Sequence, residues 1–437
     1  MSMRSRMTGN PFLESVPEQM DRETFFRRIY GRPPFPPNMA DITQEERHVC
    51  LSYLSGLYIP MDYLYTVYDI LLRAIRTTYT TKTMLDTVRQ MQALRDHGSA
   101  GFATQAQSGS LLGVPGIGKT SAVRRCLSLL PQCITHTEYK GKPFYKKQIL
   151  YLFVECPADC SIKTLAYSMI AAVDRAIGSE YFRIAARQSR LSASALVTQV
   201  KIICLNHGIG LIVVDELQNV ISTAEKNRQI KPLIKFLVEL VNDTCTSLYF
   251  VGTSEADQLF SQQEHLKRRT RGLRLLPLKP DAAYRTFLEQ VWQYQVTPGR
   301  MALTDAAANR IYDHSGGIPS YILQIFQESQ AQALTQGKYC MDEQDIKQAI
   351  ELLSLSVPKK YAAGTSLSDF SIPVIEGRGL MATDTADAEV NRLYAKPRGR
   401  KAKARSADDL LELWKRTGRA DAFCELLIDC GLAERMV

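Results

Sequence analysis

One segment, residues 113–120 with the sequence GVPGIGKT, restricts the possible folds more than any other part of the chain. It matches the pattern G-x-x-x-x-G-K-[ST] and lies between a short apolar run and a stretch of helical character, residues 121–130. Its glycines allow backbone N–H groups to face an anion, and the helix that follows adds a partial positive charge. Lys119 can reach the outer phosphates, and Thr120 can supply a ligand to Mg²⁺. The segment therefore predicts a site for a nucleoside triphosphate.

This predicted nucleotide site includes the whole loop and the first residues of the helix, with ATP and Mg²⁺ as the expected cofactors. The competing interpretation is a Gly-rich turn that binds no nucleotide. The nucleotide-binding residues are predicted to be Gly113, Val114, Pro115, Gly116, Ile117, Gly118, Lys119, Thr120 and Ser121.

Further apolar runs follow the loop, and helical stretches separate them. The runs lie at residues 149–156, 208–216, 247–254 and 272–278. Short continuous apolar runs that alternate with helices are typical of a parallel sheet that is buried on both faces. With the run before the loop, they predict an α/β core whose parallel sheet has five strands. Residues 279–354 contain helical patterns only and predict a helical lid.

The run LIVVDE at residues 211–216 indicates the second half of the site. Its four apolar residues predict a central strand, which brings Asp215 to the carboxyl end of the sheet. There Asp215 can hold Mg²⁺ through water, and Glu216 can orient and deprotonate the attacking water. If Glu216 instead faced solvent, the protein would bind ATP without hydrolysing it. We therefore expect an ATPase in which Lys119 and Glu216 are catalytic.

Two further features can complete the catalytic set. Thr253 or the adjacent Ser254 can sense the terminal phosphate from the end of another strand, although the hydroxyl could instead cap the next helix. The basic cluster HLKRRTRG at residues 265–272 can place an arginine against the phosphate of a neighbouring subunit, where its charge stabilises the transition state. Arg269 is the first choice and Arg268 the second, against contact with DNA or exposure to solvent.

The charge of the chain is unevenly distributed. Its 54 Lys and Arg residues and 45 Asp and Glu residues give a net charge of +9, and the segment KPRGRKAKAR at 396–405 contains no acidic residue. Such a basic segment indicates a polyanionic partner, most simply nucleic acid. The chain has no apolar run of the roughly 18 to 20 residues that a membrane helix needs. With no CxxC pair among ten cysteines and no apolar leader, we expect a cytoplasmic protein with free thiols.

The same patterns divide the chain into five segments. The first combines an extended, Pro- and Arg-rich arm over residues 1–40 with two or three amphipathic helices over 43–94, broken at Pro60. The others are the α/β core, the lid, a basic flexible spacer, and a helical tail that binds a partner or packs on its own core. In order along the chain, the five segments span residues 1–107, 108–278, 279–354, 355–405 and 406–437.

The order of these motifs resembles that of the AAA+ ATPases, with a P-loop NTPase core and a helical lid. Within that group the chain resembles the TnsC regulators of TnsABCD-type transposons, which are related to TniB and MuB. The motifs that carry the resemblance are NPFLESVP, ECPADCSIKTL, VVDELQN, LVNDT, KRRTRG, VWQYQ and GGIPSYILQIF. Ser320, in the last of them, stands where many AAA+ proteins have an arginine that senses the nucleotide. This departure implies slow hydrolysis, which suits a switch.

The resemblance implies a protein that assembles with ATP at its subunit interfaces into rings or helical filaments around DNA. A target-selection protein of the TnsD or TniQ type would recruit it, and it would then recruit a transposase of the TnsA and TnsB type. It implies roles for Lys119 and Thr120 at the nucleotide and metal, and for Asp215 and Glu216 in metal binding and hydrolysis. It also implies that Thr253 is the sensor and Arg269 the finger, and that the tail docks on the TnsA-type subunit.

Candidate DNA contacts lie in the long stretch between the loop and Asp215. Residues 138–148 predict a hairpin or loop, and three arginines after residue 178 are spaced four and three apart, which places them on one helix face. Contacts of Lys and Arg with the DNA backbone would tolerate any sequence and depend on salt. A solvated basic surface is the alternative. The candidate residues are Lys163, Arg183, Arg187 and Arg190.

Two other functions compete with the transposition regulator. A replication initiator or helicase loader of the AAA+ type would carry a dedicated DNA-reading domain after the lid, and residues 355–437 do not resemble one. A non-hydrolysing module would bind DNA and use ATP only to hold its subunits together.

Overall fold

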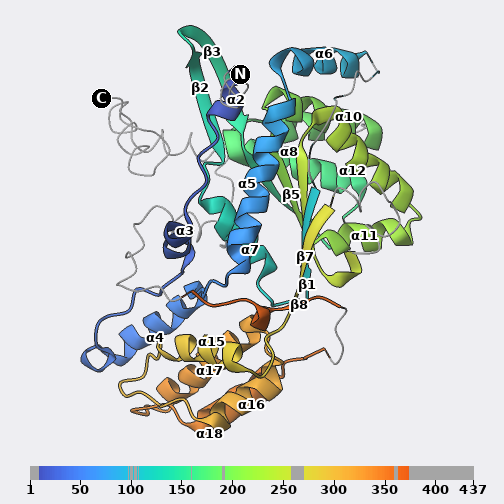
Figure 1. Cartoon of the computed structure of the whole chain (residues 1–437). Coiled ribbons are helices and arrows are strands. Elements are labelled where there is room, and N and C mark those ends of the chain that lie inside the picture. The colour runs from blue at the N-terminus through green and yellow to red at the C-terminus, as the bar shows by residue number, and fades with distance from the viewer. Residues whose placement is uncertain are drawn as a thin grey trace, which may run out of the picture. The chain divides into compact units, whose positions relative to one another are not determined.

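The computed structural model describes residues 9–96, 98, 102, 106, 108–158, 160–188, 192–256, 270–358 and 363–373. This part of the chain contains a six-stranded sheet in the order β4-β5-β6-β1-β7-β8 (Figure 1), and every neighbouring pair is parallel. The predicted α/β fold class is confirmed, with one strand more than expected. The strands are β1 (Ser108–Gly113), β4 (Tyr151–Glu155), β5 (Leu211–Asp215), β6 (Ser247–Gly252), β7 (Thr270–Leu276) and β8 (Thr365–Ser366).

Helices cover both faces of this sheet. Successive strand residues point to opposite faces, so Val213 and Val214 of β5 belong to two separate hydrophobic clusters. On the Val213 face lie α5 (Tyr63–Thr81) and α7 (Lys119–Ser128). On the Val214 face lie α8 (Ile162–Ile177), α10 (Ala193–Asn206), α11 (Leu217–Lys226) and α12 (Ile230–Thr244). A sheet covered in this way explains the continuous apolar runs.

α5 is an integral part of the core, although the sequence places it in a separate N-terminal segment. Its apolar stripe includes Val67, Leu71 and Ile75, which are fully buried against the sheet and α7. At its C-terminal end Thr78 Oγ1 donates to the carbonyl of Gly210 at 2.8 Å, directly before β5. This helix therefore supplies one of the two layers that cover the sheet.

The region before α5 contains helices where the sequence predicts an extended arm. α2 (Pro11–Glu14) and α3 (Arg22–Ile29) begin after Asn10 and Asp21, whose side chains accept hydrogen bonds from backbone N–H groups in the first turn. The prediction was wrong here because these caps, and the buried faces of two short helices, were not recognised. The helices α4 (Gln44–Tyr53), α5 and α6 (Met84–Arg95) lie in the stretch where helices were expected, and short turns η1 (Met39–Asp41) and η2 (Leu54–Gly56) flank α4.

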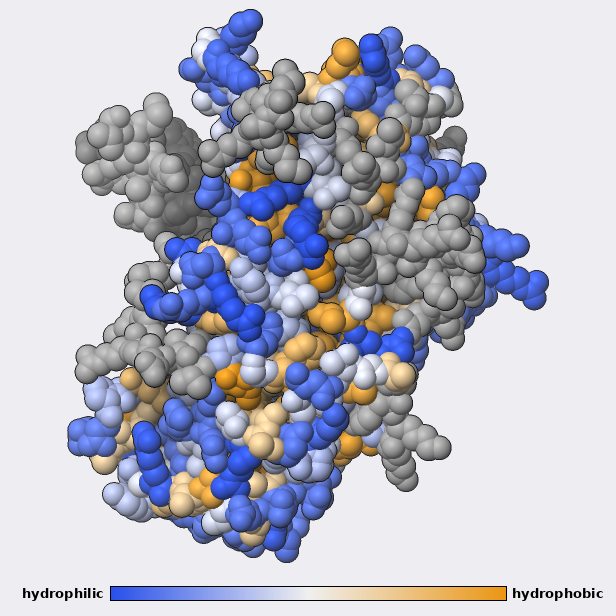
Figure 2. Space-filling view, in the orientation of Figure 1, coloured by the Kyte–Doolittle hydropathy of each residue, from blue (hydrophilic) through white to orange (hydrophobic). Residues whose placement is uncertain are grey.

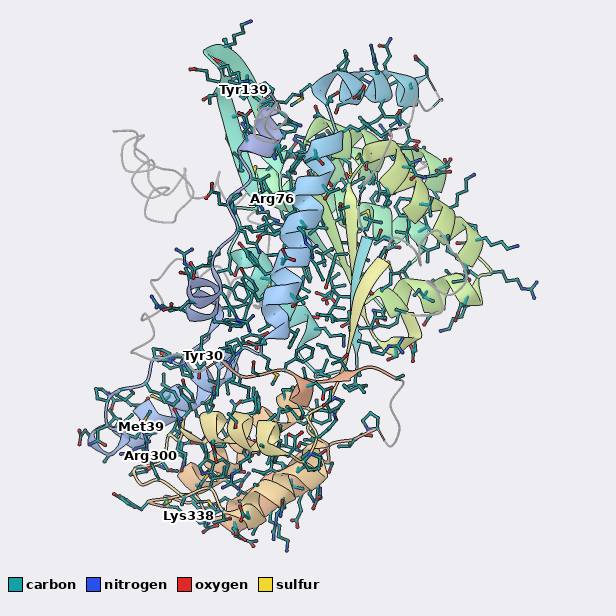
Figure 3. The ribbon with its side chains drawn as sticks, viewed as in Figure 1. Tyr30, Met39, Arg76, Tyr139, Arg300 and Lys338 are labelled. Carbon is teal, nitrogen blue, oxygen red and sulfur yellow. The ribbon has the colours of Figure 1, made fainter. Side chains whose placement is uncertain are left out.

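A β-hairpin projects from the core between α7 and β4 (Figure 1). It consists of β2 (Cys133–Tyr139) and β3 (Lys142–Ile149), and its turn has φ of +51° at Lys140 and +75° at Gly141. Hydrophilic side chains cover its tip (Figure 2). Tyr139, next to the turn (Figure 3), connects the hairpin to α2, because its hydroxyl donates to Glu14 at 2.8 Å. The hairpin predicted over 138–148 is thus present and longer.

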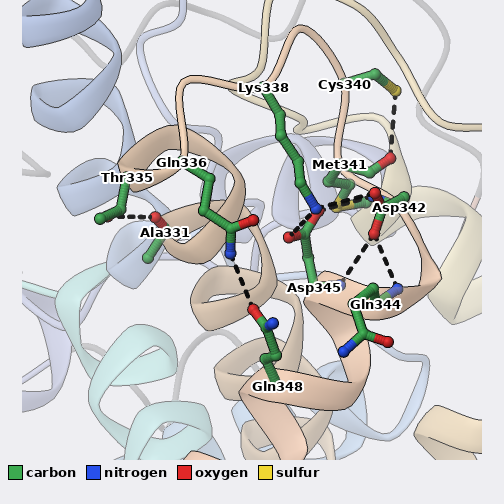
Figure 4. A network of polar contacts seen from close by, with 10 residues as sticks. All are labelled: Ala331, Thr335, Gln336, Lys338, Cys340, Met341, Asp342, Gln344, Asp345 and Gln348. Carbon is green, nitrogen blue, oxygen red and sulfur yellow. Dashed lines mark hydrogen bonds and ion pairs between the residues drawn. The ribbon is translucent and has the colours of Figure 1, made fainter.

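The lid is helical, as expected. Its helices are α15 (Ala282–Trp292), α16 (Asp305–Ser315), α17 (Pro319–Thr335) and α18 (Glu343–Leu353). Lys338 lies between α17 and α18. Its ammonium group pairs with Asp342 at 2.9 Å and with the buried Asp345 at 2.7 Å, at the start of α18 (Figure 4). The same two aspartates form a capping box that begins α18. These contacts hold the α17–α18 corner of the lid.

After the lid the chain returns to the edge of the sheet. β8 and the turn η4 (Leu367–Asp369) lie within the stretch predicted to be a flexible spacer, so that prediction was wrong for residues 365–369. The Ser366 hydroxyl donates to the carbonyl of Pro277 at 2.7 Å, and Lys279 pairs with Asp369 at 2.9 Å. The basic run 396–405 and the tail 406–437 lie outside the described residues. Among the described helices, none is both long enough and apolar enough to cross a membrane.

Candidate nucleotide-hydrolysis site

The carboxyl ends of β1, β5 and β6 meet at one edge of the sheet, because these strands are parallel and β6 lies between the other two. β1 leads directly into the loop, where Gly116 and Gly118 have φ of +80° and +96°. Only glycine adopts such values without strain. α7 then begins at Lys119. The predicted order of strand, loop and helix is therefore present, and the first turn of α7 adjoins the loop.

Lys119 is buried within the loop that it follows. Its ammonium group donates to the carbonyl oxygens of Gly113 at 3.0 Å and Val114 at 2.9 Å, and the residue is only 8% exposed. Burial lowers the pKa of Lys119, whereas the carboxylates of Glu216 and Asp215 act in the opposite direction. A cation in such poorly solvated surroundings interacts strongly with a bound anion.

Thr120 and Asp215 lie in direct contact. Thr120 Oγ1 donates to Asp215 Oδ2 at 2.8 Å, and Asp215 Oδ1 accepts the backbone N–H of Glu216 at 3.0 Å. Burial raises the pKa of Asp215 to about 6, and the hydrogen bond from Thr120 opposes that rise. A hydroxyl and a carboxylate beside a phosphate-binding loop are hard oxygen donors, which Mg²⁺ prefers. The residues present therefore fit the predicted cation site.

Glu216 follows β5 in a left-handed backbone conformation, with φ +54° and ψ +41°. Its carboxylate accepts a hydrogen bond from the side-chain amide of Gln218, in the first turn of α11. Gln218 Oε1 in turn accepts the backbone N–H of Thr253 at 3.1 Å. Gln218 is not among the site residues predicted from the sequence, although it lies two positions after Glu216 in the motif VVDELQN. Nothing in the sequence around Gln218 predicts its contact with the end of β6.

Thr253 lies directly after β6, at the same edge of the sheet. Its hydroxyl oxygen is buried and has no hydrogen-bond partner in the part of the chain that the structure describes. In the turn η3 (Ser254–Ala256), the Ala256 N–H donates to the Thr253 carbonyl at 3.0 Å and not to the Thr253 hydroxyl. A buried hydroxyl without a partner costs free energy, and a ligand at this edge would supply one.

The lid touches the loop at Gly116. The backbone N–H of Ser320, at the start of α17, donates to the Gly116 carbonyl at 3.2 Å. A Cβ atom on Gly116 would lie only 2.3 Å from Ser320 Oγ, so the absence of a side chain permits this approach. The lid residue that departs from the common AAA+ pattern is therefore a neighbour of the nucleotide loop.

Of the predicted DNA contacts, three lie on two helices that pack together. The first turn of α9 (Tyr181–Arg187) is bound to α8 by Asp174, whose carboxylate accepts the N–H groups of Tyr181 and Phe182. The Tyr167 and Phe182 rings are in contact, with centroids 5.7 Å apart. Lys163 lies one turn before Tyr167 on the same face of α8. Lys163, Arg183 and Arg187 therefore belong to one region, and Arg183 pairs with Glu180.

Three predicted residues cannot be placed. Arg190, Arg268 and Arg269 lie outside the described residues. Their proposed contacts, with DNA and with the phosphate of a neighbouring subunit, therefore stay predictions.

A match to a known sequence family covers the region of this site. Residues 103–260 match the sequence family described as the AAA domain. No curated protein sequence matches the chain. Among solved structures, it is similar to the Aeropyrum pernix ORC2 protein in its ADP form, with 14% identity over 76% of this chain and 74% of that chain and a TM-score of 0.41.

Two other solved structures are similar to the chain at comparable levels. Drosophila ORC bound to DNA has 12% identity over 97% of this chain and 86% of that chain, with a TM-score of 0.43. Cdc6p from Pyrobaculum aerophilum has 14% identity over 63% of this chain and 69% of that chain, with a TM-score of 0.37. Residues 103–260 therefore match the AAA domain in sequence, and they contain the phosphate-binding loop and strands of the parallel sheet.

Proposed function

We propose that this protein is an ATP-dependent, DNA-binding assembly factor for transposition. One observation supports the ATP-dependent part most strongly: Lys119, Thr120, Asp215, Glu216 and Thr253 lie at a single edge of the parallel sheet. The resemblance of its motifs to the TnsC regulators supports the role in transposition. ATP binding would promote assembly on DNA, and hydrolysis would limit or reset the assembly.

In the proposed hydrolysis, the loop N–H groups and Lys119 hold the outer phosphates of ATP. Thr120 and Asp215 would hold Mg²⁺, which would neutralise charge on the phosphate oxygens when bound. Glu216 orients a water molecule and accepts its proton while the water oxygen attacks the terminal phosphorus. The bond to the bridging oxygen breaks, and the products are ADP and phosphate. The Thr253 hydroxyl donates to an oxygen of the terminal phosphate.

Phosphate release in the presence and absence of duplex DNA tests this assignment. We expect Glu216→Gln to lower turnover by about 100-fold or more, with nucleotide affinity nearly unchanged, because it removes a general base. Glu225→Gln, on the exposed side of α11, is the matched control and should hydrolyse ATP normally. Equal turnover in Glu216→Gln and the wild type would remove Glu216 from the mechanism.

We infer that duplex DNA contacts the region formed by α8 and α9 through its phosphate backbone. Lys163→Ala and Arg187→Ala should each weaken binding to all sequences alike and lower the salt dependence by about one released counterion. Lys347→Ala, on the exposed side of α18 in the lid, is the control. A sharp preference for one DNA sequence would favour a replication initiator instead.

Self-association would place Arg269, or Arg268, against the ATP of a neighbouring subunit. Electron microscopy of the protein with duplex DNA and a non-hydrolysable ATP analogue should reveal rings or helical filaments. A protein that stays monomeric and does not bind duplex DNA in the presence of nucleotide would overturn the proposal.

The proposed partners are a target-selection protein of the TnsD or TniQ type and transposase subunits of the TnsA and TnsB type. Deletion of residues 396–437 should leave ATP-dependent DNA binding largely intact and uncouple the transposase. Unchanged transposition by the truncated protein would exclude docking through the tail.

A further inference from the structure

Gln218 connects two parts of the ATPase site that come from different strands. Its amide nitrogen donates to the Glu216 carboxylate beyond β5, and its amide oxygen accepts the Thr253 N–H beyond β6 at 3.1 Å. Both ends of one side chain are therefore used, one toward the predicted general base and one toward the predicted phosphate sensor.

The backbone around Gln218 leaves space for this bridge. A Cβ atom on Gly252, the last residue of β6, would lie 2.8 Å from Gln218 Oε1, so any larger residue there would displace the amide. Glu216 adopts a left-handed conformation that L-residues rarely populate. Gln218 therefore connects the end of β6, where Gly252 leaves room for its amide, to Glu216 after β5, whose backbone is left-handed.

The chemistry of the bridge suits few side chains. A glutamine offers a donor at one end and an acceptor at the other, so it can satisfy a carboxylate and a backbone N–H at once. An ionised glutamate offers only acceptors, and it would repel Glu216. Methionine has a similar length and shape but neither a strong donor nor a strong acceptor.

We propose that Gln218 is a positioning residue for ATP hydrolysis, which holds the Glu216 carboxylate in place and couples it to the end of β6 at Thr253. This inference rests on the proposed role of Glu216. A contact between the Thr253 hydroxyl and the terminal phosphate would then be transmitted to Glu216 through a single side chain. The bridge thus links sensing of the phosphate to the orientation of the base.

Gln218→Met is the first test, because it removes both hydrogen bonds with little change in shape. We expect kcat to fall by about tenfold while KM for ATP stays within about twofold, since only the orientation of the base is lost. Gln332→Met is the matched control, because Gln332 donates to Glu328 at 2.7 Å on α17. It should retain normal kcat. Wild-type kcat in Gln218→Met would overturn the proposal.

A double-mutant cycle separates positioning from a general structural effect. In the Glu216→Gln background, Gln218→Met should cause no further loss, because the base that it positions is already absent. Equal losses in both backgrounds would indicate a structural role and overturn the proposal. If Glu216→Gln itself hydrolyses ATP normally, the proposed role of Glu216 fails. If only Gln218→Met is normal, the coupling fails and the role of Glu216 stands.

The pH profile of Gln218→Glu supplies a readout that a structural role would not change. A protonated glutamic acid can donate to Glu216 as the amide does, whereas an ionised one repels it. The ratio of Gln218→Glu kcat to wild-type kcat should therefore rise as the pH is lowered. A ratio that does not change with pH would contradict the proposed hydrogen bond.

Discussion

Lys82, at the C-terminal end of α5, places an ammonium group in the apolar core. The residue is 2% exposed, and its Nζ atom has no hydrogen-bond partner among the residues that the structure describes. Burial lowers the pKa of Lys82 from 10.5 to about 8. In the unfolded chain the proton is held until higher pH, so the free energy of unfolding should rise as pH increases from about 8 to about 10.5.

We predict that Lys82→Met raises the free energy of unfolding by about 3 kcal/mol at pH 7, and that this gain disappears near pH 10.5. Denaturant unfolding at both pH values measures it. Lys201→Met is the control, because Lys201 is buried but pairs with Glu239 at 2.8 Å and Asp243 at 2.9 Å. That substitution should destabilise the protein. Destabilisation by Lys82→Met at pH 7 would contradict the prediction.

Thr253 allows stability and activity to be separated at a single residue. Thr253→Val keeps the shape of the side chain and removes the buried hydroxyl that has no partner among the described residues. We expect the melting temperature to stay equal or rise slightly, while kcat falls by about tenfold. Thermal unfolding and phosphate release measure the two effects. A variant with normal kcat would argue that Thr253 does not sense the phosphate.

At the scale of elements, the phosphate-binding loop and the first turn of α17 are in direct contact at Gly116, which has no side chain to separate them. Both Gly116 and Gly118 have left-handed φ, but a Cβ atom on Gly118 would meet nothing within 4 Å. Gly116→Ala therefore combines backbone strain with a clash against Ser320, whereas Gly118→Ala adds only the strain, about 1–2 kcal/mol.

We predict that Gly116→Ala lowers ATP affinity more than Gly118→Ala does, and that adding Ser320→Gly recovers part of the loss. Titration calorimetry with ATP measures the affinities. Part of the loss should persist, because the left-handed φ and Ile318, 3.1 Å from the added Cβ, remain. Equal losses in both single variants, with no recovery, would show that the lid contact does not influence the loop.

At the scale of the whole molecule, one hydrophobic cluster joins the N-terminal helices, the sheet and the lid. Phe12, Leu71, Val213 and Phe326 all belong to it. The N-terminal segment is therefore not an accessory that can be removed from the ATPase domain. Its loss would expose the sheet face that α5 covers.

We predict that a chain beginning at residue 98 does not form a cooperatively folded domain, which circular dichroism and limited proteolysis would detect. A milder test is Phe12→Ala, which should cost about 3–5 kcal/mol because Phe12 is buried. Phe182→Ala should cost about 1 kcal/mol or less, because the Phe182 ring contacts Tyr167 but remains 43% exposed. Normal folding of the shortened chain would contradict this view of α5.

Much of this arrangement was predictable from local pattern. The loop with Lys119, the strand that ends in Asp215 and Glu216, and the helical lid were all expected, because each depends on a contiguous run of residues. The helices α2 and α3 were missed because their apolar faces are too short to give a clear period. β8 has only two residues. Gln218 was missed because neither of its hydrogen bonds can be inferred from the residues beside it.

The sequence by itself determined five of the six strands of the sheet, the loop and the position of Asp215 and Glu216 after β5, since backbone N–H groups can surround a phosphate only where glycines allow it. Only the tertiary structure decided which helix covers the sheet and which side chain bridges two strand ends. Those contacts join residues far apart in the chain, such as Thr78 with Gly210 and Gln218 with Thr253. Their free energy depends on which surfaces meet in the folded protein, and no local pattern encodes that choice.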